Sequence, residues 1–202
     1  MKYSNPNSVS KLYNLHKMLN INFTPFPNLE TQHLQLRRLV NDDFNEILAL
    51  RSDNEIMQYI PRPLAKTKED ALENIAIINS RIESNEGINW AITLKNDSKL
   101  IGIIGHYRLK PEHYRAEIGY MLLPEYHGKG IMTEAIKEVV NYGFEIMKLH
   151  SIEALIDPRN LASEKVLQKN GFVKEAHFIE NEYYEGKFLD SVVYSILNKQ
   201  RF

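Results

Sequence analysis

The spacing of hydrophobic residues changes several times along this chain, and each change predicts a boundary between secondary-structure elements. Ile118 to Leu123 is a short apolar run of the kind found in buried strands. Further on, apolar residues recur with the spacing of one helix face, at Ile131, Ala135, Val139, Tyr142 and Ile146. A strand followed by a long amphipathic helix is therefore expected in the second half of the chain.

The same analysis predicts a mixed α/β or α+β domain around one central sheet. Strands are expected at 33–39, 88–95, 99–109, 114–123, 150–156, 171–180 and 187–197. Helices are expected at about 42–51, 67–84, 128–147 and 160–170, with an apolar turn-like segment at 54–61. Thr67 and Asp70 have the spacing of a capping box at the start of the second helix.

A glycine-rich turn joins the strand at 114–123 to the helix that follows it. Its sequence is Tyr126-His127-Gly128-Lys129-Gly130-Ile131-Met132-Thr133, and Pro124 ends the strand before it. Two glycines permit backbone conformations that a side chain would block, and a helix N-terminus attracts anions through its free amides and its dipole. The turn predicts a phosphate-bearing ligand, although glycines at such a place also occur as plain turn residues.

Two common nucleotide-binding motifs do not fit this turn. A P-loop requires a glycine five residues before a Gly-Lys-Ser/Thr triplet, but position 123 is leucine and Lys129 is followed by Gly130. A Rossmann fingerprint requires a third glycine where this chain has Thr133.

Two sequence blocks resemble the GNAT N-acetyltransferase superfamily, in particular its RimJ/RimL-like branch. The first is Glu117-Ile-Gly-Tyr-Met-Leu-Leu-Pro-Glu-Tyr-His-Gly-Lys-Gly-Ile-Met-Thr-Glu-Ala, and the second is Asn160-Leu-Ala-Ser163-Glu-Lys-Val-Leu-Gln-Lys-Asn-Gly171-Phe172. The resemblance covers about residues 30 to 198. It implies a single GNAT-like domain whose mixed, mostly antiparallel sheet of about seven strands is splayed between its fourth and fifth strands and flanked by helices.

The resemblance also implies an acetyl-CoA site. Backbone groups of Met121, Leu122 and Leu123 would bind the pantetheine arm, and the amides of residues 128–133 would bind the pyrophosphate. The binding set thus comprises these three residues together with His127, Gly128, Lys129, Gly130, Ile131, Met132, Thr133, Asn160 and Ser163. His127 stands where the family has Gln or Arg, and Met132 stands where it has a small residue. Asn160 has a simpler role open to it as a helix cap.

Direct acetyl transfer to a primary amine is the activity that the resemblance implies. Glu117 is the candidate general base and Ser163 the candidate group near the coenzyme sulfur. Many relatives have a tyrosine four residues after the Ser163 position that protonates the thiolate, but here that residue is Leu167. The proton donor is therefore left open between Ser163, a water and another tyrosine, with the further alternative that no specific acid is needed because the CoA thiolate is only a modest base. Carboxylates at Glu180, Glu182 and Glu185 could attract a cationic acceptor or form a solvated hairpin edge.

Composition limits the other function classes. The chain has 202 residues, 43% of them hydrophobic and 25% charged, which suits one globular domain. A net charge of −1 provides no basic surface field for nucleic acid. Cysteine is absent and the histidines lack metal-ligand spacing, so no metal is expected. The resemblance implies acetyl-CoA as the cosubstrate.

No signal-peptide core and no apolar run of membrane-spanning length occur, so a cytoplasmic protein without membrane contact is expected. Residues 1–29 are expected to form an N-terminal extension, and residues 30–202 the acetyltransferase domain. Within the extension, Leu12, Leu15 and Leu19 have helical spacing, which indicates a short docking helix or a frayed tail. A homodimer is possible by analogy.

Three functional hypotheses remain at this stage. The first is an N-acetyltransferase whose acceptor is a protein or peptide N-terminus or a small-molecule amine. The second is a non-catalytic acyl-CoA-binding sensor, to which the Leu167 and His127 departures give weight. The third is an unrelated α/β phosphate-binding protein.

Overall fold

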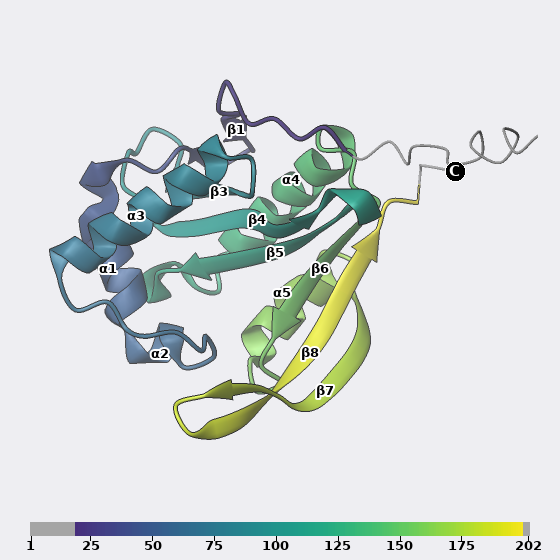
Figure 1. The fold of residues 1–202 in the computed structure, drawn as a ribbon. Helices are drawn as coiled ribbons and strands as arrows, with labels where there is room; N and C mark the ends of the chain where they lie inside the picture. Colours follow the sequence, from purple (N-terminus) through teal and green to yellow (C-terminus); the bar gives the residue numbers. More distant parts are fainter. Residues whose placement is uncertain (1–18, 200–202) are drawn as a thin grey trace, which may run out of the picture.

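One mixed sheet runs through the protein, whose computed structural model describes residues 19–199 (Figure 1). The strands are β1 (Leu29–Glu30), β2 (Leu34–Arg37), β3 (Ile88–Leu94), β4 (Gly102–Lys110), β5 (Arg115–Leu122), β6 (Ser151–Ile156), β7 (Val173–Tyr184) and β8 (Lys187–Leu197). The helices are α1 (Phe44–Ser52), α2 (Asn54–Met57), α3 (Lys68–Glu83), α4 (Ile131–Glu145) and α5 (Leu161–Lys169).

The strand order in the sheet is β1-β2-β3-β4-β5-β6-β8-β7. Within residues 19–199, neighbouring strands are antiparallel except for β5 and β6, which run parallel. The predicted GNAT-like architecture is therefore confirmed. The sheet has eight strands rather than about seven, because Leu29 and Glu30 pair with Leu36 and Gln35 as a short edge strand.

Strands β5 and β6 separate soon after they meet. Their pairing runs only from Arg115 opposite Ser151 to Glu117 opposite Glu153, whereas β5 continues to Leu122 and β6 to Ile156. Figure 1 shows the two ribbons diverging toward their carboxyl ends. This is the splay that the family resemblance implied between strands 114–123 and 150–156.

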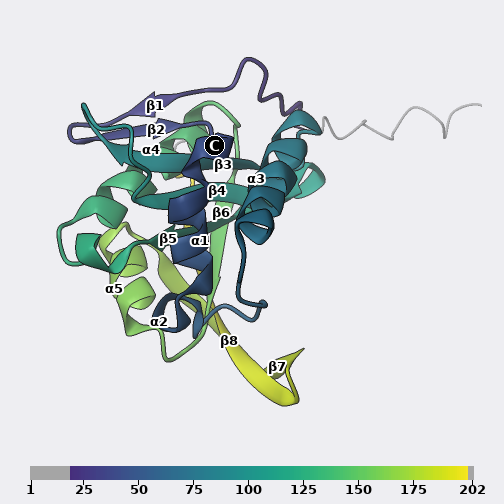
Figure 2. The ribbon, with the colours of Figure 1, turned by 90° about the vertical axis from the view of Figure 1, so that its left-hand side faces the viewer.

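Helices cover both faces of the sheet (Figures 1 and 2). One core cluster joins buried residues of α1 and α3 to Met121 and Leu123, and the other joins those of α4 to Ile118 and Leu122. Because side chains alternate along a strand, odd positions of β5 face α1 and α3, and even positions face α4 and α5. Odd and even residues of β5 beside the gap therefore lie on opposite faces of the sheet.

The predicted stripe of α4 is confirmed at four of its five positions, since Ile131, Ala135, Val139 and Tyr142 are buried. The prediction for Ile146 is wrong, because this residue lies beyond the end of α4 and is 65% exposed. The amides of both Ile146 and Met147 bond to the Tyr142 carbonyl, so the chain leaves the helix through a turn wider than the α-helical one. Met147, 6% exposed, occupies the core in place of Ile146.

Other element boundaries differ from the predicted ones, and the reasons are local. Helix α4 starts at Ile131 rather than 128, because Gly128 and Gly130 have positive φ angles that a right-handed helix excludes. The segment predicted as a turn at 54–61 begins with α2, whose first amides bond to the Asp53 side chain. The capping box of Thr67 and Asp70 is confirmed.

The described part of the N-terminal segment packs against the domain. Phe23 is 2% exposed, and its amide donates to Asn85 Oδ1 at 2.9 Å. Trp90 Nε1 donates to the Pro27 carbonyl at 2.7 Å. Leu19 contacts the core, whereas Leu12 and Leu15 of the predicted helical stripe lie outside the described residues. None of the helices within residues 19–199 combines the length and apolar character needed to cross a bilayer.

A buried histidine predicts how stability depends on pH. His106 on β4 is fully buried, with Nε2 3.0 Å from the Val139 carbonyl, and burial lowers its pKa from 6.5 to about 4. The unfolded chain therefore takes up a proton at pH 6.5 that the folded chain refuses until about pH 4. The contribution of neutral His106 is complete above pH 6.5 and is lost as pH falls toward 4.

We therefore expect a His106→Gln variant to lose less stability on acidification than the wild type. Between pH 7 and pH 5 the wild-type free energy of unfolding should fall by about 2 kcal/mol more than that of the variant. Urea denaturation of both proteins at the two pH values measures the difference. Equal losses would show that His106 titrates normally in the folded protein.

Candidate active site

The turn after β5 has an open, glycine-dependent backbone. Gly128 and Gly130 adopt φ angles of 72° and 80°, a region that other residues enter at a cost. A Cβ added at either position would meet nothing within 4 Å. These glycines therefore serve the backbone conformation, and the space above them is free for a ligand.

Helix α4 begins at this turn without a side-chain cap. Gly130 is its N-cap residue, so the amides of Ile131, Met132 and Thr133 in the first turn lack intrahelical partners. Met132 directs its bulk into the core, where it is 9% exposed, and so leaves the turn open. Lys129 is exposed, and its Nζ lies 5.4 Å from the centre of the Tyr126 ring. Pyrophosphate binding at these positions stays a prediction, and the arrangement suits it.

His127 closes the turn onto the end of β5. Its Nε2 donates to the Leu122 carbonyl at 2.9 Å. Relatives in the family have Gln or Arg at the position of His127. In this chain the His127 side chain bonds to the backbone at the end of β5 and so fixes the conformation of the turn.

The backbone amide and carbonyl groups of β5 point alternately toward β4 and toward the gap. The Leu123 amide bonds to Ile101, next to the paired residues Gly102 and Leu122. Since backbone groups alternate in an antiparallel pair, Met121 and Leu123 point toward β4, and Tyr120 and Leu122 point toward the gap. Of the three predicted pantetheine contacts, only Leu122 has its backbone on the gap side, and Tyr120 joins it there.

Glu117 lies where β5 and β6 part, and it is buried with 4% exposure. Its Oε2 accepts from Arg108 at 2.9 Å, and the charge of Glu117 raises the pKa of that arginine. The hydroxyl of Tyr107 also interacts with Glu117, and burial, followed by this carboxylate, raises the pKa of Tyr107. A carboxylate with two fixed donors is thus presented at the mouth of the gap.

The second sequence block lies on the other side of the gap. Asn160 caps α5, with its Oδ1 accepting from the Ser163 amide at 3.0 Å, so the simpler role predicted for Asn160 is present. Leu167, in the position of the family tyrosine, is fully buried in the core. The Tyr120 hydroxyl lies beside the Ser163 side chain. Burial raises the pKa of Tyr120 and the neighbouring serine partly offsets that rise, but the two side chains form no hydrogen bond of standard geometry.

The three hairpin carboxylates, Glu180, Glu182 and Glu185, are exposed on β7 and on the turn that follows it. Glu182 lies close enough to Arg108 to raise the pKa of that arginine further. The other two have local roles, because the Glu180 amide bonds to Asp190 and Glu185 interacts with Tyr184. The cluster is mainly a solvated hairpin edge, with one member reaching the candidate site.

A cavity of about 430 Å³ opens between the segment after α1 and the β7–β8 hairpin. Its charged lining comprises Arg62, Asp157, Arg159, Glu185 and Lys187. Arg159 is bound to Asp157 at 2.6 Å, which neutralises that pair. The charge of Arg62 partly offsets the rise in the pKa of Tyr107 that burial and Glu117 cause, so this side of the cavity lies within electrostatic reach of the Glu117 cluster.

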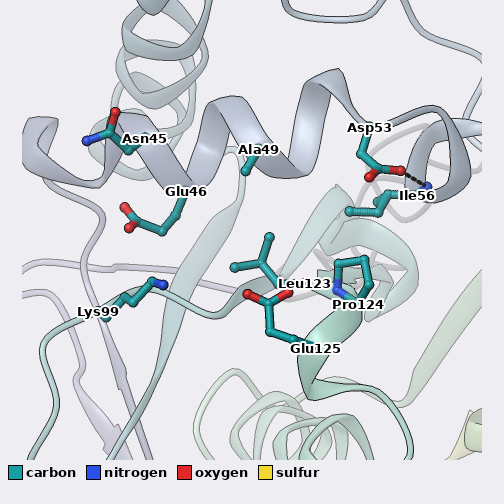
Figure 3. Close-up of a pocket in the computed structure, with 9 residues that line it drawn as sticks. All are labelled: Asn45, Glu46, Ala49, Asp53, Ile56, Lys99, Leu123, Pro124 and Glu125. Atoms are coloured by element: carbon teal, nitrogen blue, oxygen red, sulfur yellow. Dashed lines mark hydrogen bonds between the residues drawn. The ribbon is translucent and has the colours of Figure 1, made fainter.

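A second hollow of about 340 Å³ lies between α1 and the residues after β5 (Figure 3). Glu46, Asp53, Lys99 and Glu125 provide its charges, and Asp53 is already engaged in capping α2. It contains neither Glu117 nor Ser163, so it does not belong to the gap. Within residues 19–199, no three His, Cys, Asp or Glu side chains gather in a way that could hold a metal ion.

The structure thus brings Glu117, Leu122, His127, the glycine turn and Ser163 around one gap. Sequence reasoning did not find Tyr107, Arg108 or Arg62. Tyr107 is the register partner of Glu117, and Arg108 occupies a bulge with φ 48°, so neither contact has a signal in local sequence. A strand pairing of β4 with β5, had its register been predicted, could have identified Tyr107.

Comparisons with known proteins agree with this geometry. A family profile described as "Acetyltransferase (GNAT) domain" matches residues 33–173. The uncharacterized N-acetyltransferase YoaA of Bacillus subtilis (strain 168) is 37% identical over 172 residues, covering 85% of this chain and 97% of the relative.

Two solved structures are also similar. The ribosomal-protein-S5-alanine acetyltransferase of Vibrio fischeri superposes with a TM-score of 0.73 at 27% identity, covering 86% of this chain and 98% of that one. The spermidine N-acetyltransferase of Vibrio cholerae, in complex with CoA and spermine, has a TM-score of 0.72 at 26% identity, with coverage of 83% and 96%.

Proposed function

Because the chain belongs to the GNAT family of acetyl-CoA-dependent N-acetyltransferases, we propose that it transfers acetyl directly to the α-amine of a protein or peptide. The main support for this reaction is the position of Glu117, a buried carboxylate at the last paired position of β5 and β6. It stands where a strand-like pantetheine arm entering the gap would end.

Transfer requires a neutral amine, and Glu117 is the group that takes the proton. Relative to pH 7, deprotonating an α-amine costs about 1 kcal/mol and a lysine-like amine about 4.6 kcal/mol. Arg108 and Tyr107 hold Glu117 in one orientation, which lets it accept a proton directly or through a water. The free amides of α4 and the glycine turn would hold the pyrophosphate.

The choice of acceptor rests on the charge of the cavity between the segment after α1 and the β7–β8 hairpin. Once Arg159 and Asp157 are paired, Arg62 and Lys187 outnumber Glu185. A polyamine carries several positive charges and would meet a lining with one excess positive charge. An α-amine on a peptide brings carboxylates and backbone carbonyls that suit the same lining, so the peptide is the better match.

A panel of acceptors tests this proposal through CoA release. Peptides with an acidic second residue should exceed both spermidine and an aminoglycoside in kcat/KM by about tenfold, equivalent to 1.4 kcal/mol. Matched peptides with lysine as second residue control for peptide length. For the peptides, kcat/KM should rise with pH and level near pH 8, the range of an α-amine.

The alternatives have separate outcomes in the same assay. Faster turnover of spermidine than of any peptide would transfer the proposal to a small-molecule amine. Binding of acetyl-CoA without turnover of any amine would favour the sensor hypothesis. A thermal shift with acetyl-CoA but not with ATP or NAD establishes binding independently of turnover.

A further inference from the structure

One buried hydroxyl near the gap has no role in the reaction as described so far. Tyr120 lies on β5 three residues beyond Glu117, and its hydroxyl is buried without a hydrogen-bond partner within residues 19–199. A buried hydroxyl that makes no hydrogen bond is costly and calls for an explanation. The neighbouring polar side chain is that of Ser163, at the start of α5.

We propose that Tyr120 is a positioning residue: when acetyl-CoA fills the gap, its unpaired hydroxyl turns to donate a hydrogen bond to Ser163 and thereby aims the Ser163 hydroxyl proton at the departing CoA sulfur. The inference rests on the proposed function and deepens its mechanism. It concerns the leaving group, for which the usual tyrosine is replaced by the buried Leu167.

Tyr120 keeps a proton that it can donate. Burial raises the pKa of its hydroxyl, so it stays protonated throughout the reaction. In the proposed arrangement Tyr120 donates this proton to Ser163 Oγ, which leaves the Ser163 proton free to point elsewhere. The nearest carboxylate on α5, Glu164, is already bonded to the Tyr194 hydroxyl at 2.7 Å. It does not compete for the Tyr120 proton.

The two faces of the sheet separate the two halves of the reaction. Glu117 occupies an odd position of β5, on the face of α1 and α3, whereas Tyr120 occupies an even position facing α4 and α5. The amine therefore loses its proton on one face, and the thiolate is stabilised on the other.

The step balances without an extra reactant. The amine nitrogen forms a bond to the thioester carbon, the carbon–sulfur bond breaks, and the amine proton passes to Glu117 and then to solvent. CoA leaves as a thiolate that accepts the Ser163 hydrogen bond and takes its proton from water afterwards. Ser163 and Tyr120 keep their protons throughout.

Titration of CoA bound to the enzyme tests the proposal without an acceptor. The ultraviolet absorbance of the thiolate reports the pKa of the bound thiol, with desulfo-CoA as the blank. Tyr120→Phe should raise this pKa by about 0.5 to 1 pH unit and lower kcat by about 3- to 10-fold, leaving the Kd of acetyl-CoA unchanged. In a Ser163→Ala background, Tyr120→Phe should have no further effect on either quantity.

Tyr142→Phe is the matched control, because Tyr142 is a 5% exposed tyrosine of the same core cluster that packs against Trp90. It should leave the thiol pKa at the wild-type value. If Tyr120→Phe changed neither quantity, or changed both equally with and without Ser163, the proposal would be overturned. Failure of the wild type to bind CoA would instead remove the proposed function itself.

Discussion

Glutamine at position 117 is expected to lower kcat by about 100-fold or more while leaving the Kd of acetyl-CoA unchanged. The substitution keeps the shape of a side chain that is 4% exposed, and its amide oxygen can still accept from Arg108. It removes the ability to take a proton from the amine. Steady-state kinetics with the preferred peptide, together with acetyl-CoA titration, measure both quantities.

Glu153→Gln is the control for this experiment. Glu153 lies opposite Glu117 on β6 and is bound by Arg115 and Lys110. Its substitution removes a similarly placed, ion-paired carboxylate, and kcat should stay within about threefold of the wild type. Unchanged kcat/KM for Glu117→Gln across the pH range would exclude Glu117 as the base.

The sequence predicted the fold where local pattern and burial agree. The stripe of α4 and the apolar run of β5 are each produced by one periodicity, and both elements form around those residues. The prediction for Ile146 failed because the helical spacing of apolar residues continues in the sequence beyond the last residue of α4. Periodicity records which residues could share a face, but it does not record where a helix ends.

The candidate site was predictable only in the residues of its two sequence blocks. The glycine turn, Glu117 and Ser163 belong to those blocks, whereas the partners of Glu117 come from β4. Arg108 reaches Glu117 because the β4–β5 pairing is irregular between Tyr107 and Lys110. Such a bulge depends on tertiary pairing, so local propensity does not reveal it. The bond from His127 to Leu122 is likewise a contact that a family pattern of residue types cannot specify.

Tryptophan at position 130 should weaken acetyl-CoA binding by about 100-fold or more, since two charge-assisted hydrogen bonds are worth about 3–6 kcal/mol. The space above Gly130 is open, so an indole there would cover the first amides of α4. Thermal-shift titration with acetyl-CoA measures the loss, because 100 times the Kd should stabilise the wild type by about 2.7 kcal/mol.

Gly186→Trp is the control that separates the backbone strain of Gly130→Trp from its effect on ligand binding. Gly186 has φ 81° against 80° for Gly130, and it too has nothing within 4 Å of an added Cβ, but it lies in the β7–β8 turn. Both variants should lose similar stability without ligand, about 1–2 kcal/mol for a left-handed residue. Only Gly130→Trp should also lose the acetyl-CoA shift. Normal acetyl-CoA binding by Gly130→Trp would mean that the coenzyme phosphates lie elsewhere, since the amides at this turn would be covered.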